Sequence, residues 1–357
     1  MKRHMTWLVT TLAIAALAPP SGIAGASASS VTLRCPSGLA LSGNHLYFSE
    51  SGGHSVRRID LDSGEVTLIA GTGSQGLAGD GGPATAANLA GPMGLALTRD
   101  GGLIIADQGN DRIRRVDLES GTIRTVVGGG QGEVDGPALE MALAGPYDVA
   151  IDPRGDLLIA DTNHDRILRV DGESGMTRIF AGTGERDFAG DGGPAKEAHL
   201  RRPHVVAVDH LGRVVIGDSF NLRIRRVDPQ GRIHTIAGTG EIASSGDGGP
   251  APEASFVFFG AIHVNARGDL YVTEFGANKV RRIDSETGRV STVVGDGAER
   301  LAGDGGPAAQ ASLASPIGLV VDGAENLYIA DCGNHRIRRV DGKSGQIESL
   351  VGGEPEK

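Results

Sequence analysis

Pro316-Ile-Gly-Leu-Val-Val321 is the last of six copies of one phrase along this chain. The earlier copies are Pro36-Ser-Gly-Leu-Ala-Leu41, Pro92-Met-Gly-Leu-Ala-Leu97, Pro146-Tyr-Asp-Val-Ala-Ile151, Pro203-His-Val-Val-Ala-Val208 and Phe259-Gly-Ala-Ile-His-Val264. Their starts lie 56, 54, 57, 56 and 57 residues apart. A fixed period of this size, with short apolar runs and Gly-rich turns in each unit, is typical of radially repeating β proteins. The repeat therefore predicts an all-β fold.

Each unit reads as four short strands. In the second unit we expect strands at 94–97, 103–106, 112–116 and 123–127, joined by tight turns into one antiparallel sheet. An open stack of repeats needs polar outer faces on its end units, but the first and last units here are as apolar as the middle ones. The sequence thus predicts a closed six-bladed β-propeller of four-stranded antiparallel blades. The blades span roughly 36–91, 92–145, 146–202, 203–258, 259–315 and 316–353.

A second phrase, Gly-Asp-Gly-Gly-Pro-Ala, connects successive blades. It occurs at 79–84, 190–195, 246–251 and 303–308, and in a shortened form at 135–138. Asp-Gly-Gly predicts a tight turn, and Pro-Ala begins a short helical turn. An apolar residue follows each connection and is expected to wedge between neighbouring blades: Leu89, Leu143, Leu200, Phe256 and Leu313. The sixth unit lacks a connection, and Leu33-Arg-Cys-Pro36 supplies the missing phrase, so the chain ends should meet between blades six and one.

The first 28 residues have the pattern of a secretory signal peptide. Lys2 and Arg3 precede an apolar run at 7–18, and the small residues ending at Ala28 form a cleavage site. Residues 29–357 would then form the propeller, secreted or periplasmic, with no transmembrane segment. Removing the two basic residues from the 34 Lys and Arg, against 44 Asp and Glu, leaves a formal charge of −12. Such acidity argues against a nucleic-acid partner, and we expect a monomer.

The two cysteines suggest how the ring is closed. Cys35 precedes the first strand of blade one, and Cys332 follows the second strand of blade six. In an antiparallel blade these two points lie on the same rim, and an exported chain favours disulfides. We therefore predict a Cys35–Cys332 bond. The alternative is a pair of unpaired buried thiols.

Charged residues recur at two fixed places in the repeat. Each second strand ends in an acid, and these six rim acids are Glu50, Asp107, Asp161, Asp218, Glu274 and Asp331. They could form a cation site, but a cation stands five residues after five of the six, so we favour a structural role in which each acid accepts hydrogen bonds from that cation or from loop amides. Paired arginines such as Arg114-Arg115 are expected to cover the blade faces with their stems and keep their charged heads in water.

Departures from the repeat are the better guide to function. Positions leading into the central channel are mostly small or apolar, but Tyr147, Asp148, His204 and His263 are exceptions. We expect these four to converge at one channel mouth as a ligand site, because propeller ligands bind there. Chance polar residues lining a wet channel would give the same pattern.

The sixth unit resembles the NHL repeat. The similarity lies in Pro316-Ile-Gly-Leu-Val-Val-Asp322, Asn326-Leu-Tyr-Ile-Ala-Asp331 and Gly333-Asn-His-Arg-Ile337, and it extends from Pro36 to the carboxyl terminus. The Gly-Asp-Gly-Gly-Pro-Ala connection resembles that of exported bacterial NHL propellers and of the teneurin NHL domain. The resemblance implies a six-bladed propeller that acts as a binding or scaffold module for a protein, peptide or glycan. Fold alone does not fix activity.

A propeller enzyme is the alternative. The peptidyl-hydroxyglycine lyase of this fold resembles the chain at Pro203-His204, but its zinc site needs three such histidines, and the equivalent positions here are not histidine. Gluconolactonase-like propellers hold a divalent metal with central carboxylates, of which only Asp148 is available. Asp148, His204 and His263 are the one metal set the sequence offers, as a hypothesis. We expect binding rather than catalysis, with no resident cofactor.

Overall fold

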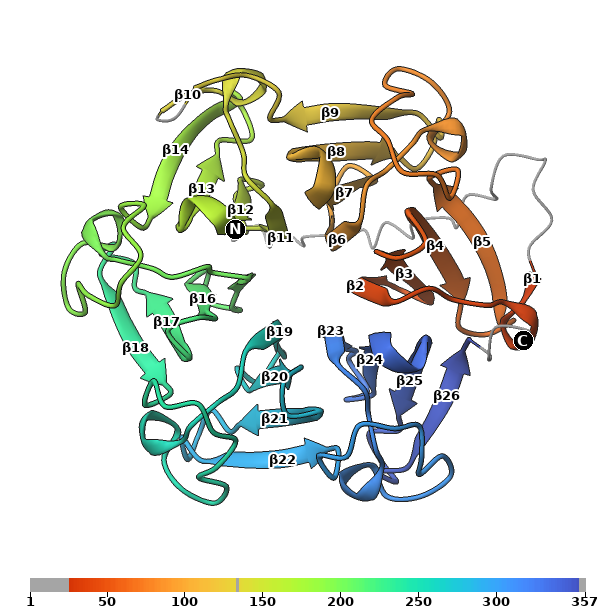
Figure 1. Cartoon of the computed structure of the whole chain (residues 1–357), viewed down its shortest axis with the longest axis vertical. Helices are drawn as coiled ribbons and strands as arrows, with labels where there is room; N and C mark the ends of the chain where they lie inside the picture. The colour runs from red at the N-terminus through yellow and green to blue at the C-terminus, as the bar shows by residue number, and fades with distance from the viewer. Residues whose placement is uncertain (1–25, 133–134, 353–357) are drawn as a thin grey trace, which may run out of the picture.

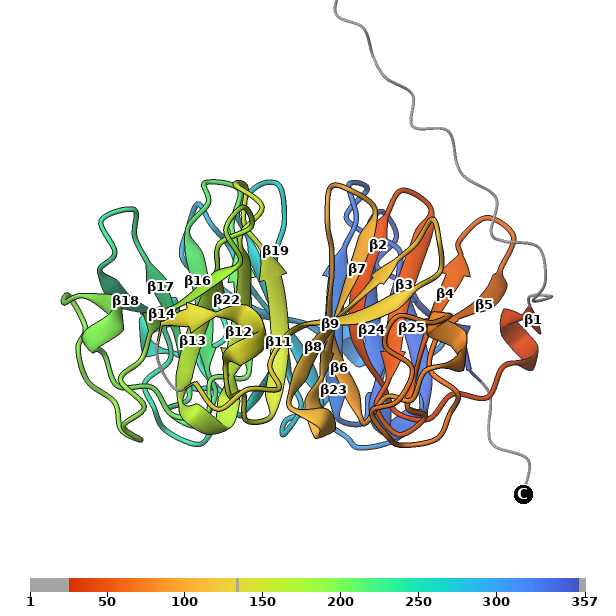
Figure 2. The ribbon, with the colours of Figure 1, turned by 90° about the horizontal axis from the view of Figure 1, so that it is seen from above.

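Six blades surround a central channel in the computed structural model, which describes residues 26–132 and 135–352 (Figure 1). Each blade is an antiparallel sheet in which chain order equals spatial order from the channel outward. The strands run along the ring axis, so the loops gather on two opposite faces (Figure 2). The predicted six-bladed, four-stranded propeller is confirmed.

The strands of the first three blades are as follows. Blade one has β2 Pro36–Ser42, β3 His45–Glu50, β4 Ser55–Asp60 and β5 Glu65–Ala70. Blade two has β6 Pro92–Leu97, β7 Gly102–Asp107, β8 Arg112–Asp117 and β9 Ile123–Val127. Blade three has β11 Pro146–Ile151, β12 Leu157–Asp161, β13 Arg166–Val170 and β14 Met176–Ala181.

The other three blades follow the same plan. Blade four has β15 Val205–Val208, β16 Val214–Asp218, β17 Arg223–Val227 and β18 Ile233–Ala237. Blade five has β19 Phe259–Val264, β20 Leu270–Glu274, β21 Lys279–Ile283 and β22 Val290–Val294. Blade six has β23 Pro316–Val321, β24 Leu327–Asp331, β25 Arg336–Val340 and β26 Ile347–Val351.

The connections run along the outermost strand of the next blade. Pro83 pairs with Thr122 beside β9, and Gly136–Pro137 forms β10, which pairs with β14. Ala26–Ser27 forms β1 and covers β5 in the same way. This pairing shields edges that would otherwise invite association with other strands. The predicted helical turns are short 3-10 helices at Ala84–Ala86, Ala138–Glu140, Ala195–Glu197, Ala251–Glu253 and Ala308–Gln310.

Apolar wedges between blades form the core. Leu89 is fully buried and packs with residues of blades one and two, and Phe256 does the same between blades four and five. Leu33 occupies the equivalent place between blades six and one, against Phe48 and Tyr328. The core is thus divided into six clusters at the blade interfaces, as predicted from the repeat.

Four arginines are the largest buried side chains, and they correct one prediction. Arg114, Arg225, Arg281 and Arg338 are at most 1% exposed, so their heads are not in water. Arg225 is typical, because its Nη2 contacts Asp191 of the preceding connection at 2.7 Å and its Nη1 lies 3.6 Å from the rim acid Asp218. A buried guanidinium needs such paired carboxylates to offset its lost hydration. Four of the five connections are therefore tied to the next blade by an ion pair.

All six rim acids are buried and accept a hydrogen bond from a backbone amide of the loop entering their own blade. The donors are the amides of Arg34, Ala90, Ala144, Arg201, Val257 and Ala314, at 2.7–3.1 Å. The charged partner differs from the expected one. Among the described contacts only Asp161 pairs with the cation five residues later, Arg166, whereas the other five pair with an arginine seven residues later.

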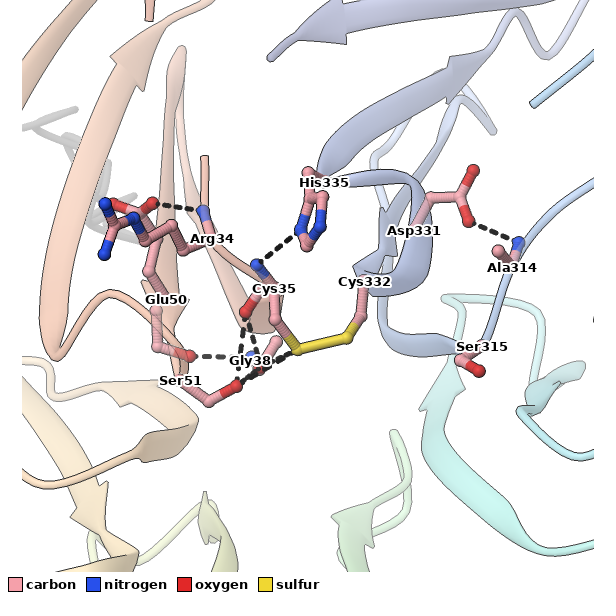
Figure 3. Close-up of a disulfide and its surroundings, with 12 residues drawn as sticks. Arg34, Cys35, Gly38, Glu50, Ser51, Ala314, Ser315, Asp331, Cys332 and His335 are labelled. Atoms are coloured by element: carbon pink, nitrogen blue, oxygen red, sulfur yellow. Dashed lines mark hydrogen bonds between the residues drawn. A yellow bond between two sulfur atoms is a disulfide. The ribbon is translucent and has the colours of Figure 1, made fainter. Parts of the chain in front are cut away.

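The ring is closed by a disulfide rather than by a shared blade. The predicted Cys35–Cys332 bond is present and joins the rims of blades one and six (Figure 3). Beside it, the Cys35 amide donates to His335 Nδ1 at 3.2 Å, and Ser51 Oγ lies 3.2 Å from Cys35 Sγ. Every blade is contiguous in sequence, so no strand exchange holds the two ends together.

The predicted signal peptide falls mostly outside the described residues, which begin at Ala26. Cleavage after Ala28 would remove β1 from the edge of blade one. Within the described residues, no helix has the length and hydropathy needed to span a bilayer.

Candidate functional site

The first strands of the blades line a channel cavity of about 350 Å³. Tyr147, Asp148 and His263 are among the lining residues, together with small and aliphatic side chains. The rim face, defined here as the face that carries the rim acids and the disulfide, surrounds one mouth of this channel. The residues that depart most from the repeat lie on this face, at blades three to five.

Four aromatic rings form a column at this mouth. Tyr147 stacks on His204 with centroids 4.5 Å apart and planes 8° apart. His204 is followed by Phe275 at 6.5 Å, and Phe275 by Phe258 at 5.7 Å, each pair within 23° of parallel. Phe220 packs its ring against the edge of His204 at 5.6 Å and against Phe258 at 5.0 Å. These side chains, hereafter the aromatic column with Phe220 beside it, come from three different blades.

His204 contributes a neutral aromatic ring to this column. Burial, with a smaller contribution from the nearby Arg202 charge, lowers the pKa of His204 to about 4, so the ring is neutral at physiological pH. The ring donates a hydrogen bond to the Phe259 carbonyl, and its Nδ1 is buried without a partner among the described residues. One ring nitrogen is thus engaged, and the other is shielded from solvent.

Asp148 joins two inner strands. Its carboxylate accepts from its neighbour Val149 at 2.9 Å and from Val206 of the next blade at 3.1 Å. Burial nevertheless raises the pKa of Asp148 to about 7 and also raises the pKa of Tyr147. Both carboxylate oxygens are thus engaged in holding blade three against blade four.

His263 does not join the other three predicted residues. Tyr147 is the second residue of β11 and His204 directly precedes β15, whereas His263 pairs with Tyr271 near the far end of β19. Burial lowers the pKa of His263 to about 4, and the Glu325 charge opposes this shift. In the described part of the chain, no three His, Cys, Asp or Glu side chains are placed to hold a metal ion. The structure therefore brings Tyr147 and His204 together and leaves His263 at another level of the channel.

Polar side chains join the rim loops at the interface between blades three and four. The Arg202 amide donates to Asp165 at 2.8 Å, and the Arg202 guanidinium donates to Asn163 at 3.1 Å. Arg186 of the connection pairs with Asp165 at 2.6 Å. The hydrogen bond from the Arg202 amide to Asp165 has an equivalent at four other interfaces. There the backbone amides of Gly91, Gly145, Ser315 and Cys35 donate to His54, Asp111, Asn278 and His335, respectively.

Between blades four and five the same four positions are apolar. Phe220, Leu222, Ile242 and Phe258 replace Asn163, Asp165, Arg186 and Arg202 in turn, and we call them the apolar seam. Leu222 cannot accept the hydrogen bond that the other five interfaces make. Leu222 and Phe258 also hold left-handed backbone conformations, φ 56° and 28°, which are unfavourable for bulky residues. Ile242 is 74% exposed.

Neither the apolar seam nor Phe275 was predicted from the sequence. The predicted site residues are departures from the repeat at channel-facing positions, whereas the seam departs from it in the rim loops. Comparing the rim loops of the six units reveals the seam. Phe220 stands where four other units have glycine, and Phe258 stands where the other five units have Gly, Ser, Cys or Arg. At this interface apolar packing of Phe220, Phe258 and Phe275 takes the place of the amide hydrogen bond.

Comparisons with known proteins agree with this fold. The family model described as the teneurin NHL domain matches residues 139–245, and the NHL repeat model matches 313–340. The chain is 28% identical over 339 residues to Protein SUPPRESSOR OF QUENCHING 1, chloroplastic, of Arabidopsis thaliana, covering 89% of this chain and 31% of that protein. It is 27% identical to human NHL repeat-containing protein 2, over 73% of this chain and 40% of that protein. The chain thus spans well under half the length of these curated relatives.

Two solved structures show the same architecture at low identity. An auxiliary nutrient binding protein from Bacteroides thetaiotaomicron superposes with a TM-score of 0.63 at 18% identity, over 89% of this chain and 70% of that one. Virginiamycin B lyase from Staphylococcus aureus superposes with a TM-score of 0.53 at 17% identity, over 91% and 88% of the two chains. At these identities the likeness concerns the fold alone.

Proposed function

Given that this chain is an NHL-repeat six-bladed propeller, we propose that it is an exported binding module whose ligand docks on the rim face over blades four and five. The ligand class is a protein, peptide or glycan. The signal-peptide pattern of residues 1–28 and the disulfide both suit a secreted or periplasmic protein.

The apolar seam carries this proposal. A rim built only for stability would keep the amide hydrogen bond that five of the six interfaces make. Partly exposed aromatic rings on a rigid scaffold are the usual centre of a binding surface, because they bury much apolar area at little entropic cost. The aromatic column continues this surface to the channel mouth.

The test is a variant in which polar residues found at other interfaces replace three residues of the apolar seam. Phe220→Asn, Ile242→Arg and Phe258→Ser introduce residues that other interfaces already carry at Asn163, Arg186 and Ser315. We call this triple change the polarised variant and expect it to fold. Wild type and polarised variant are applied to peptide and glycan arrays, and the wild-type hits should be lost in the variant.

Two control variants test whether an added arginine at other interfaces affects binding. Gln75→Arg and Glu299→Arg place the same charge at the position of Ile242 on two other interfaces, and both residues are exposed. These controls should bind as wild type does. Hits that persist in the polarised variant, or that disappear equally in the controls, would contradict the proposed location.

A metal-dependent lyase or lactonase in the channel has less support. Its three predicted ligands do not come together, and Asp148 and His204 are engaged in packing and hydrogen bonds. Elemental analysis of protein purified without chelators separates the two functions. The binding proposal predicts no stoichiometric metal, and a bound metal that is lost on His204→Ala would favour the enzyme.

A further inference from the structure

Two arginines stand at the edge of the apolar seam without carboxylate partners. The Arg201 carbonyl accepts from the Phe220 amide at 3.1 Å, which places Arg201 beside the seam. Arg201 and Arg202 are exposed, and neither forms an ion pair within the described residues. Arg202 lies over the Phe220 ring, 5.1 Å from its centroid, and its charge lowers the pKa of His204. The Arg202 guanidinium therefore lies directly beside the apolar seam. Although the chain has a net charge of −10, the surface here is locally positive.

The arrangement of the rings also limits what can bind. His204 has Tyr147 on one face and Phe275 on the other, Phe275 and Phe258 cover each other, and Arg202 covers Phe220. A sugar ring needs a free aromatic face for stacking, and these faces are mostly taken. Ring edges carry partial positive charge and favour carboxylate oxygens or the face of another aromatic ring.

We propose that the ligand is a peptide segment of a partner protein in which an aromatic side chain is flanked by carboxylates. The aromatic side chain packs on the apolar seam, and the carboxylates pair with Arg201 and Arg202. This inference rests on the proposed function and specifies the class of ligand. The cations beside the seam supply charge complementarity that the acidic remainder of the surface lacks.

The experiment uses four synthetic peptides with Gly-Ser flanks and the cores Asp-Phe-Glu, Asn-Phe-Gln, Lys-Phe-Lys and Asp-Ala-Glu. Dissociation constants are measured by calorimetry for the full mature chain, the polarised variant and the double variant Arg201→Gln/Arg202→Gln. The double variant Arg124→Gln/Arg178→Gln is the equal-charge control, because both residues are exposed on outer strands. We expect the Asp-Phe-Glu peptide to bind best and to weaken about tenfold in the Arg201/Arg202 variant, with a reduced salt dependence.

The possible outcomes separate this inference from the proposed function. If the Asp-Phe-Glu and Asn-Phe-Gln peptides bind equally well and both lose binding in the polarised variant, the acidic-peptide inference is overturned, but the proposed binding site stands. Array hits confined to glycans, or self-association that the polarised variant abolishes, likewise overturn the peptide. Absence of binding to all four peptides up to about 1 mM also overturns it. Binding that is unchanged in the polarised variant overturns both proposals.

Discussion

Single buried arginines hold the blades of this propeller to their connections. Arg225 is fully buried between Asp218 of its own blade and Asp191 of the preceding connection. Blade three manages without such an arginine, because Leu168 takes that position and Arg166 with His164 pairs with Asp161 instead. Each buried acid thus has a cation, supplied in one of two ways.

Replacing Arg225 by Met should therefore be costly. Met fills similar space but leaves the buried Asp218 carboxylate unpaired, so we expect a loss of about 3–5 kcal/mol in the free energy of unfolding. Arg226→Met is the control, because this neighbour is partly exposed and should lose under about 1 kcal/mol. Urea titration of both variants measures the difference. Equal losses would show that the buried ion pairs do not stabilise the fold as described.

Buried carboxyl groups also set the pH dependence of stability. Burial raises the pKa of Asp148 and Asp218 to about 7. Because the folded chain binds these protons more tightly than the unfolded chain, the stability that Asp148 and Asp218 contribute is lost as the pH rises from about 4 to about 7. Burial lowers the pKa of His204 and His263 to about 4, so these two rings oppose that loss between about pH 4 and pH 6.5. Hydrogen bonds lower the pKa of turn carboxyls such as Asp117 and Asp171, and the stability that these contribute is lost below about pH 4.

We therefore expect Asp148→Asn to change the pH dependence of the melting temperature. The variant removes one carboxyl whose pKa is raised, so its melting temperature relative to that of wild type should rise between pH 5 and pH 8. Differential scanning calorimetry of both proteins across this range measures the difference. A difference that does not change with pH would contradict the role assigned to Asp148.

At the scale of elements, the connections do more than link blades. The Gly-Asp-Gly-Gly turn places its aspartate against both the buried arginine and an amide of the outer strand, as Asp191 does with Arg225 and Thr235. In the shortened connection, Asp135 accepts from the Ile179 amide, and blade three offers Leu168 in place of the arginine. The two connections form a natural comparison.

Asp191→Ala should lower the free energy of unfolding by about 1–3 kcal/mol, because Arg225 loses a charged partner. Asp135→Ala loses an exposed hydrogen bond and should cost under about 1 kcal/mol. Thermal or urea unfolding compares the two variants. If Asp135→Ala costs as much as Asp191→Ala, the turn conformation and not the ion pair stabilises the connections.

Much of the arrangement of the elements can be predicted from the sequence. The strands, the wedges such as Leu89 and the Cys35–Cys332 pair follow from local periodicity and ring closure, and all are found. The arginine partners at a spacing of seven were missed, because the second carboxylate comes from the preceding connection. His263 was grouped with Tyr147 although it lies three residues further along a first strand, about 10 Å at roughly 3.3 Å per residue. Phe220 and Phe258 required the rim loops to be compared unit by unit.

In the whole molecule, the ring is closed by the disulfide together with an apolar interface like those between the other blades. The disulfide spans 297 residues, and at the interface of blades six and one Leu33 packs in the core while His335 accepts a hydrogen bond from the Cys35 amide. Closing so long a loop contributes on the order of 5 kcal/mol in the chain-entropy model.

The double variant Cys35→Ser/Cys332→Ser should therefore unfold at a markedly lower urea concentration. Hydrogen exchange should show its loss of protection mainly in blades one and six, where the ring opens. Alkylation and intact mass of the native protein provide the control for the oxidised state. Two free thiols in that protein, or uniform loss of protection across all blades, would contradict the disulfide as the closure of the ring.

The central claim is that the apolar seam between blades four and five is a binding surface. Its most direct test is the dissociation constant of the strongest array ligand, measured for wild type, the polarised variant and the Gln75→Arg and Glu299→Arg controls. We predict that the polarised variant binds at least about 30-fold more weakly, as loss of a central aromatic cluster implies, while both controls match wild type. An unchanged dissociation constant in a folded polarised variant would contradict the claim.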